Sequence, residues 1–291
     1  MIPASFNYKR ASSVGEALQL LKDNPDAKIL AGGHSLIPAM KLRLNQPDLL
    51  IDIAKIAELN FIRDRGKYLA IGAATTHGTI ATHKSVKAKM WWIANAAEKI
   101  GDAQVRNMGT IGGSIAHADP ASDWPAVLMA ADARIKVEGA YGDRVIPAAE
   151  FFNGFFSTEL QEGEIITEIQ IPDPTSSDTP DSWRSSYQKF AQPASRFAIV
   201  GCAVNLQLSA TGTIEQAYVA FNGVGGFAYR AHTVEAALVG HTLSDETAAA
   251  ASVLATEGAD LIMSDHYADE AYRTHLAQVV CKRAIAACMY D

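Results

Sequence analysis

The sequence predicts an α+β protein with more than one domain. Apolar residues recur at both helical and strand spacing along the first part of the chain. The segment 172–181, PDPTSSDTPD, is rich in Pro, Ser, Thr and Asp, as expected of a linker or a long exposed loop. Beyond it, strand patterns precede helical ones, which indicates a sheet followed by helices. We therefore expect a domain boundary within this segment, after a first part that begins with an α/β unit and before a final α+β domain.

Local patterns define the elements of the first unit. Ser13 can accept a hydrogen bond from the amide of Glu16, as a helix N-cap does. The apolar residues that follow fall on one helical face, namely Val14, Ala17, Leu18 and Leu21. Strands are expected over 28–31 and 49–53, with a short helix over 38–43 between them.

The later units show the same mixture of patterns. A helix is expected to begin near Met90 and to stop at Gly101, and Ser244 is the expected N-cap of a later helix. Apolar spacing around Leu276 indicates a C-terminal helix. Strand patterns occur at 68–71, 165–171, 185–190, 197–208 and 214–222.

Two glycine-rich loops are the strongest indication of function. The first is Ala31-Gly32-Gly33-His34-Ser35 and the second is Thr110-Ile111-Gly112-Gly113-Ser114. Glycine lets the backbone approach a phosphate closely, and successive amides form a nest that binds anions. Two such loops could hold a pyrophosphate from both sides, although a glycine pair alone more often marks a turn. Neither loop matches the GxGxxG fingerprint or the phosphate loop of nucleotide triphosphatases.

Polar residues cluster directly after the second loop. His117 and Asp119 lack a third and a fourth ligand at a recognisable spacing, so we expect no metal there. Asp123 could accept a hydrogen bond from a ribityl or ribose hydroxyl. Alternatively, Ser122 or Asp123 caps the helix that begins beside it, and residue type alone favours the cap.

Composition excludes several classes of protein. The chain is 48% hydrophobic and 20% charged, as in globular proteins, and its 291 residues suffice for about two domains. With 25 basic and 32 acidic residues, it has no general basic surface for nucleic acid. Three scattered cysteines indicate neither a disulfide framework nor a metal site. We expect no membrane span, no signal peptide and a cytoplasmic location.

Five segments, taken in chain order, together resemble the FAD-binding medium subunit of the molybdenum hydroxylases, the family of xanthine and carbon monoxide dehydrogenases. They are LAGGHSLIPAMKLRL, LIDI, IGAATTH, VRNMGTIGGSIAHADPASDWPAVLMAADA and GEIITEIQIP. The resemblance covers nearly the whole chain, and the first segment looks most like the carbon monoxide dehydrogenase branch. It implies a two-lobed FAD-binding domain of the vanillyl-alcohol oxidase type, with lobes at 1–55 and 56–177. It also implies a C-terminal α+β domain of the carbon monoxide dehydrogenase flavoprotein type over 178–291.

The resemblance also implies a set of residues around noncovalently bound FAD. The first loop would contact the pyrophosphate, and the second loop would face it. In the family the position of Asp123 carries an acidic FAD ligand, so the resemblance favours a ligand over a cap. Ser114 stands where the family often has Asn; serine is shorter, which leaves the role of this side chain open. The implied cofactor contacts are Ala31, Gly32, Gly33, His34, Ser35, Leu36, Thr110, Gly112, Gly113, Ser114, His117, Asp123, Ile166 and Lys189.

The implied function is electron transfer within a complex. A large subunit would oxidise the substrate at a molybdenum–pterin centre, and a small subunit would carry electrons through two iron–sulfur clusters. This chain, which lacks the cysteine motifs of such clusters, would pass them from FAD to an external acceptor. We expect a dimer of heterotrimers and no catalytic or metal-binding residue in this chain. The substrate class, whether carbon monoxide, an aldehyde, a purine or an N-heterocycle, stays open. The alternatives are a stand-alone FAD-dependent oxidoreductase of the same fold and a nucleotide-binding protein without redox function.

Overall fold

A computed structural model describes residues 1–176 and 182–290 of the chain. Within these residues, the strands form one parallel sheet, two antiparallel sheets and a two-stranded ribbon. Each of the three sheets packs against helices, which confirms the predicted α+β class. The predicted division at residues 55/56 and 177/178 stays a prediction, and its second boundary lies outside the described residues.

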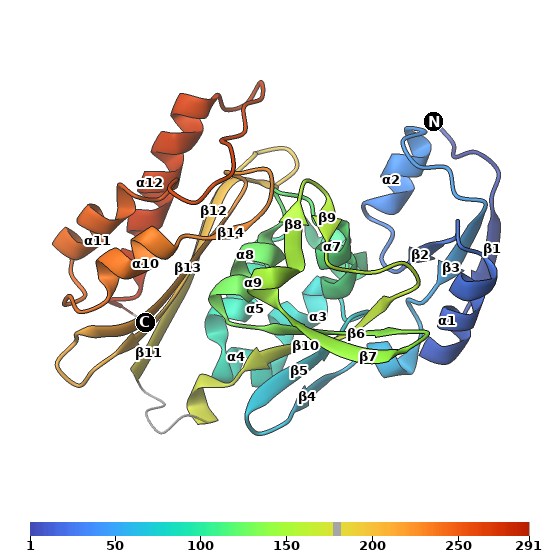
Figure 1. The fold of residues 1–291 in the computed structure, drawn as a ribbon, viewed down its shortest axis with the longest axis horizontal. Helices are drawn as coiled ribbons and strands as arrows, with labels where there is room; N and C mark the ends of the chain where they lie inside the picture. Colours follow the sequence, from blue (N-terminus) through green and yellow to red (C-terminus); the bar gives the residue numbers. More distant parts are fainter. Residues whose placement is uncertain (177–181, 291) are drawn as a thin grey trace.

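The N-terminal lobe is a small parallel sheet with two helices (Figure 1). Its strand order is β1-β3-β2, so β3 is central and fully buried. Ser13 accepts from the amide of Glu16, which confirms the predicted N-cap of α1. The elements are β1 (Asn7–Arg10), α1 (Val14–Asp23), β2 (Lys28–Leu30), α2 (Leu36–Lys41) and β3 (Leu49–Asp52).

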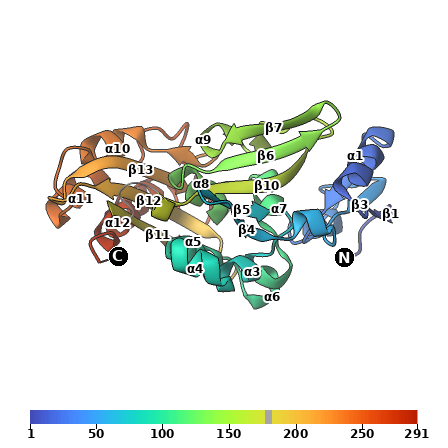
Figure 2. The same ribbon diagram turned by 90° about the horizontal axis from the view of Figure 1, so that it is seen from below.

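A five-stranded antiparallel sheet forms the middle of the molecule, in the order β4-β5-β10-β6-β7. Helices α3 to α6 gather on one side of it (Figure 2). Its strands are β4 (Ile62–Asp64), β5 (Tyr68–Gly72), β6 (Arg134–Gly139), β7 (Gly142–Pro147) and β10 (Ile165–Pro172). Its longer helices are α3 (His77–Thr82), α4 (Lys84–Lys89), α5 (Trp91–Glu98), α6 (Ala103–Met108), α7 (Ile111–His117) and α8 (Asp123–Ala130).

Shorter elements complete this middle part. The ribbon of β8 (Phe152–Gly154) and β9 (Ser157–Thr158) follows α9 (Ala148–Phe151). Two 3-10 helices, η1 (Ala57–Leu59) and η2 (Pro174–Ser176), lie near the two ends of this part in sequence. η2 falls in the first half of the predicted linker, and residues 177–181 lie outside the described residues.

The C-terminal part is a sheet covered on one face by helices (Figure 1), as the sequence predicts. Its antiparallel order is β11-β12-β13-β14. Ser244 caps α11 by accepting from the amide of Thr247, which confirms that prediction. The elements are β11 (Trp183–Ala191), β12 (Ala198–Leu208), β13 (Ile214–Asn222), β14 (Tyr229–Arg230), α10 (His232–Leu238), α11 (Asp245–Ser252) and α12 (Glu270–Ala287).

Two further properties of the fold concern its helices and its cysteines. In the part of the chain that the structure covers, no helix combines the length and the apolar character needed to cross a bilayer. All three cysteines are free thiols buried in the core between the C-terminal sheet and its helices. Buried thiols of this kind pack as small apolar side chains.

Candidate functional site

The two glycine-rich loops lie against each other, although they are far apart in the sequence. A Cβ atom built on Gly32 would come within 2.7 Å of the carbonyl carbon of Met108 and 2.8 Å of the Gly109 Cα atom. Only glycine permits so close an approach of two backbones. On the open side of the junction, a Cβ on Gly113 would lie 3.8 Å from the Ala31 Cβ. The structure thus brings together the two loops that the sequence singles out.

The first loop presents backbone amides that are free to bind an anion. Within residues 1–176 and 182–290, the amides of Gly32 to Leu36 donate to no protein acceptor. Gly33 has a φ of +72°, which turns the chain so that neighbouring amides converge. Ser35 stands before α2 without making a side-chain cap, so its hydroxyl is also available. This loop has the properties of the predicted anion nest.

The backbone amides of the second loop donate hydrogen bonds to acceptors within the protein. Gly112 donates to the carbonyl of Ala73 at 2.9 Å, and Gly113 donates to the Thr110 hydroxyl at 3.1 Å. The amides on either side, of Ile111 and Ser114, donate to the carbonyls of Thr75 and Thr110. The expectation of an amide nest in this loop is therefore wrong, because Thr110 and the turn that follows β5 already accept these hydrogen bonds. Gly112 instead allows α7 to pack closely on Ala73, where a Cβ would lie 2.7 Å from a carbonyl oxygen.

Helix α7 presents an open face of small residues beside the first loop. Gly113 and Ala116, one helical turn apart, are exposed, whereas Ile111 and Ile115 are buried in the core. Ser114 and His117 are half-buried at the margins of this face, and the His117 ring lies 5.0 Å from the ring of Phe156. The sequence analysis did not single out Ala116 on this face, although its position three residues after Gly113 could have indicated it.

A buried ion pair joins α8 to the C-terminal sheet. The Lys189 ammonium lies 2.9 Å from the Asp123 carboxylate, and the two side chains are only 4% and 5% exposed. The Tyr187 hydroxyl donates to the same carboxylate. Lys189 and Tyr187 both come from β11, whereas Asp123 is the first residue of α8. The N-cap position belongs to Ser122, so the structure does not support a capping role for Asp123.

Further contacts of Lys189 extend this cluster towards the end of α5. The Lys189 ammonium donates to the carbonyls of Lys99 at 2.8 Å and of Arg196 at 2.9 Å. Lys99 in turn donates from its ammonium to the carbonyl of Tyr187 at 2.5 Å. The sequence analysis missed Lys99, because nothing in its local pattern distinguishes it from a surface lysine.

Burial dominates the electrostatics of this cluster. Burial raises the pKa of Asp123, and the charge of Lys189 opposes that shift. Burial also raises the pKa of Tyr187 well above its ordinary value, so the hydroxyl remains a donor to the carboxylate. Burial lowers the pKa of Lys99, and the neighbouring Lys189 charge lowers it further. The cluster therefore concentrates two cations and one carboxylate in a region from which water is largely excluded.

Three other residues that were predicted to contact the cofactor lie outside this buried cluster. His34 turns its Nδ1 towards the carbonyl of Gly32 at 3.0 Å, and Leu36 is the first residue of α2. Ile166 is buried on β10 within the core that also holds Ile111 and Trp124. The described residues include no group of three His, Cys, Asp or Glu side chains that could hold a metal ion.

His77 forms a hydrogen bond to the residue before the second loop, and the sequence analysis did not predict this contact. Its amide donates to the carbonyl of Gly109 at 3.0 Å, and its Nδ1 accepts from the Trp124 indole at 3.0 Å. Burial, together with the charges of His34 and Arg106, lowers the pKa of His77 to about 4. The ring is therefore neutral near pH 7, as its role as an acceptor requires.

Known proteins match this chain along almost its whole length. Residues 4–174 match the family described as "FAD binding domain in molybdopterin dehydrogenase", and residues 185–288 match the "CO dehydrogenase flavoprotein C-terminal domain". The carbon monoxide dehydrogenase medium chain of Hydrogenophaga pseudoflava is 40% identical over 291 residues, covering 99% of this chain and 98% of that one. The glyceraldehyde dehydrogenase medium chain of Sulfolobus acidocaldarius is 37% identical over 286 residues, covering 98% of each. The solved carbon monoxide dehydrogenase from Hydrogenophaga pseudoflava superposes with a TM-score of 0.94, at 40% identity and covering 100% of this chain and 99% of that one.

The neutral state of His77 predicts a pH-dependent stability. Between the ordinary pKa of 6.5 and the folded value of about 4, the unfolded chain binds a proton that the folded chain does not. The stabilisation is thus complete above pH 6.5 and is lost as the pH falls towards 4, amounting to about 3 kcal/mol. Urea unfolding between pH 7 and 4 should show that His77→Gln loses less stability than the wild type over this range. Parallel losses in the two proteins would contradict the prediction.

Proposed function

This chain belongs to the family of FAD-binding medium subunits of the molybdenum hydroxylases, and we propose that it holds FAD between its glycine-rich loops and its C-terminal domain. It takes electrons from the iron–sulfur clusters of a partner subunit and passes them to an external acceptor. The observation that carries the proposal is the run of free amides from Gly32 to Leu36 beside the open face of α7. FAD supplies the electron-transfer chemistry, and the chain supplies its position and electrostatic surroundings.

The first loop is proposed to bind the pyrophosphate. Free amides at Gly32, Gly33 and His34 would donate to phosphate oxygens, as would the hydroxyl of Ser35. Hydrogen bonds to a charged group are worth about 1.5–3 kcal/mol each, so a few of them suffice for tight binding. Other residues near the two loops are proposed to contribute to FAD binding through their shape or through side-chain contacts. They are Ala31, Leu36, Thr110, Gly112, Gly113, Ser114, Ala116, His117 and Ile166.

The buried cluster is proposed to lie at the flavin end of the cofactor. Asp123 accepts from Tyr187 and Lys189, and a carboxylate has about four acceptor positions, so it can still accept from a ribityl hydroxyl. Lys189 and Lys99 add positive charge near that end. Positive charge stabilises added electrons, because reduction makes the flavin more negative.

The proposed assembly contains two further subunits. A small subunit carries the iron–sulfur clusters, and a large subunit carries the molybdenum–pterin centre and the substrate site. We propose a dimer of such heterotrimers in the cytoplasm. Relatives are named for carbon monoxide and for glyceraldehyde, and both small molecules are candidate substrates of the complex.

Purification of the complex tests this function. Acid precipitation should release FAD into the supernatant, since we propose noncovalent binding. Carbon monoxide or glyceraldehyde should bleach iron–sulfur and flavin absorbance in the complex. The isolated chain, supplied with FAD, should remain oxidised with either substrate. Bleaching of the isolated chain at the rate of the complex would instead support a stand-alone oxidoreductase, and a colourless complex would contradict FAD binding.

Ala116→Leu tests the open face of α7. Leucine favours a helix, and position 116 is exposed, so the fold should tolerate it. Its side chain would occupy space beside the first loop and keep a pyrophosphate from the free amides. Losing two charged hydrogen bonds would cost about 3–6 kcal/mol, or roughly two to four decades of FAD affinity.

The matched control for this prediction is Ala250→Leu, at an exposed helical alanine of α11. FAD content of the purified complex and FAD titration of the stripped complex measure the effect. Full FAD affinity in Ala116→Leu would show that the face of α7 does not border the cofactor. Gly113→Val is a less direct test, because its Cβ would lie 2.8 Å from the Thr110 hydroxyl and disturb the helix cap.

A further inference from the structure

A buried arginine ties together the strand ends of the C-terminal sheet. Arg273 lies in the first turns of α12 and is only 2% exposed. Its Nη1 donates to the carbonyls of Ile199 and Gly223, each at 2.5 Å. Its Nε donates to the carbonyl of Met263 at 3.0 Å, and its Nη2 pairs with Asp265 at 2.9 Å. One planar guanidinium thus fixes three separate pieces of backbone.

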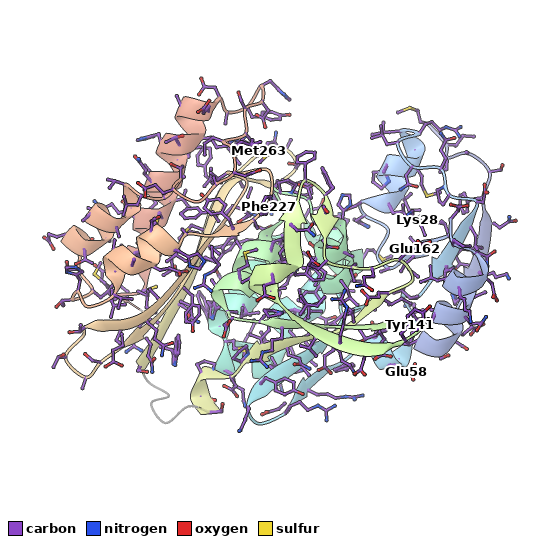
Figure 3. The ribbon with its side chains drawn as sticks, in the orientation of Figure 1. Lys28, Glu58, Tyr141, Glu162, Phe227 and Met263 are labelled. Atoms are coloured by element: carbon purple, nitrogen blue, oxygen red, sulfur yellow. The ribbon has the colours of Figure 1, made fainter. Side chains whose placement is uncertain are left out.

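The geometry around Gly223 shows how closely these pieces converge. Gly223 follows β13 with a φ of +76°, and a Cβ there would lie 2.6 Å from the Ile199 carbonyl oxygen. A side chain would therefore separate the two carbonyls that share the Arg273 Nη1. Met263, the third backbone contact, is labelled in Figure 3 together with Phe227, which packs against the core that also holds Ile111 and Trp124.

The same strand ends hold the segment that carries Asp123. The amide of Gly223 donates to the Pro120 carbonyl at 2.7 Å, and the amide of Ala198 donates to the Ala121 carbonyl at 3.3 Å. Asn222 adds a side-chain hydrogen bond to the Ala121 carbonyl at 3.5 Å. Contacts from Arg273 therefore reach the chain just before Asp123 through Gly223 itself and through the adjacent residues Ile199 and Ala198.

We infer that Arg273 is a positioning residue for the cofactor site. Its contacts fix the start of β12 and the end of β13. These two strand ends hold the turn at Pro120 and Ala121, and they thereby orient the Asp123 side chain that follows the turn. This inference rests on the proposed function, because only then does the segment face FAD. Lysine cannot replace this role, since a single ammonium cannot span acceptors arranged for the planar fork of a guanidinium.

Three variants of the intact complex test the inference. Arg273→Met keeps much of the side-chain volume but has no donor, and Arg273→Lys keeps the charge. Tyr229→Phe is the matched control: it removes a buried hydrogen bond to the Ala255 carbonyl within the same domain but keeps the ring that stacks on Phe221 near the end of β13. The readouts are thermal midpoint, rate of FAD release and amide hydrogen exchange in peptides covering residues 118–123.

Both Arg273 variants should release FAD about tenfold faster or more, and exchange in 118–123 should rise. Tyr229→Phe should lower the thermal midpoint and leave both other readouts near the wild-type values. Wild-type FAD release in Arg273→Met would overturn the inference. The inference would also be overturned if Tyr229→Phe accelerated FAD release as much as the Arg273 variants do at the same loss of thermal stability. The role of Arg273 would then be merely structural.

A milder variant keeps the test decisive if Arg273→Met and Arg273→Lys do not fold. Asp265→Asn removes the charge of one Arg273 partner whose side chain is 48% exposed, so the fold should persist. It should increase exchange in 118–123 and accelerate FAD release to a smaller degree, and no change in either would overturn the inference. A wild-type complex without FAD would contradict the proposed function instead, and the exchange readout would still test the link from Arg273 to residues 118–123.

Discussion

The buried pair of Asp123 and Lys189 is the constraint on which the arrangement of the site depends. Asp123 belongs to the middle part of the chain, and Lys189 belongs to the C-terminal sheet. Leaving one member of a buried pair without its partner typically costs about 3–5 kcal/mol. The two parts must therefore dock closely enough to bring carboxylate and ammonium together. Tyr187 and the carbonyls of Lys99 and Arg196 satisfy the remaining hydrogen bonds.

In the function that we propose, this pair and the first glycine-rich loop lie at the two ends of one FAD site. The free amides of the loop would bind the pyrophosphate, and the buried charges would lie near the flavin. Between them, α7 offers a surface of small residues and is fixed by the packing of Gly112 on Ala73. Similar glycine pairs thus serve different purposes: Gly32 and Gly33 expose amides, and Gly112 permits close helix packing. Arg273 acts behind the site, where it stabilises the strand ends that hold the chain before Asp123.

Local patterns in the sequence predicted much of this architecture. The caps at Ser13 and Ser244 depend on residues three positions away, so spacing alone reveals them. The two loops and the family follow from ordered motifs. The hydrogen bond from the Gly112 amide was not predictable, because its acceptor, Ala73, lies in the turn after β5, far away in the sequence. The contacts of Lys99, Lys189 and Arg273 likewise depend on tertiary packing that no local spacing encodes.

A double-mutant cycle on Asp123 and Lys189, read out as FAD dissociation from the intact complex, tests the central claim most directly. Asp123→Asn and Lys189→Met should each weaken FAD binding. Because each substitution removes the partner of the other residue, the double variant should lose less than the sum. The account predicts a coupling energy of about 1–3 kcal/mol, within the range measured for residues in contact. Additive losses, or FAD affinity that is unchanged in all three variants, would contradict it.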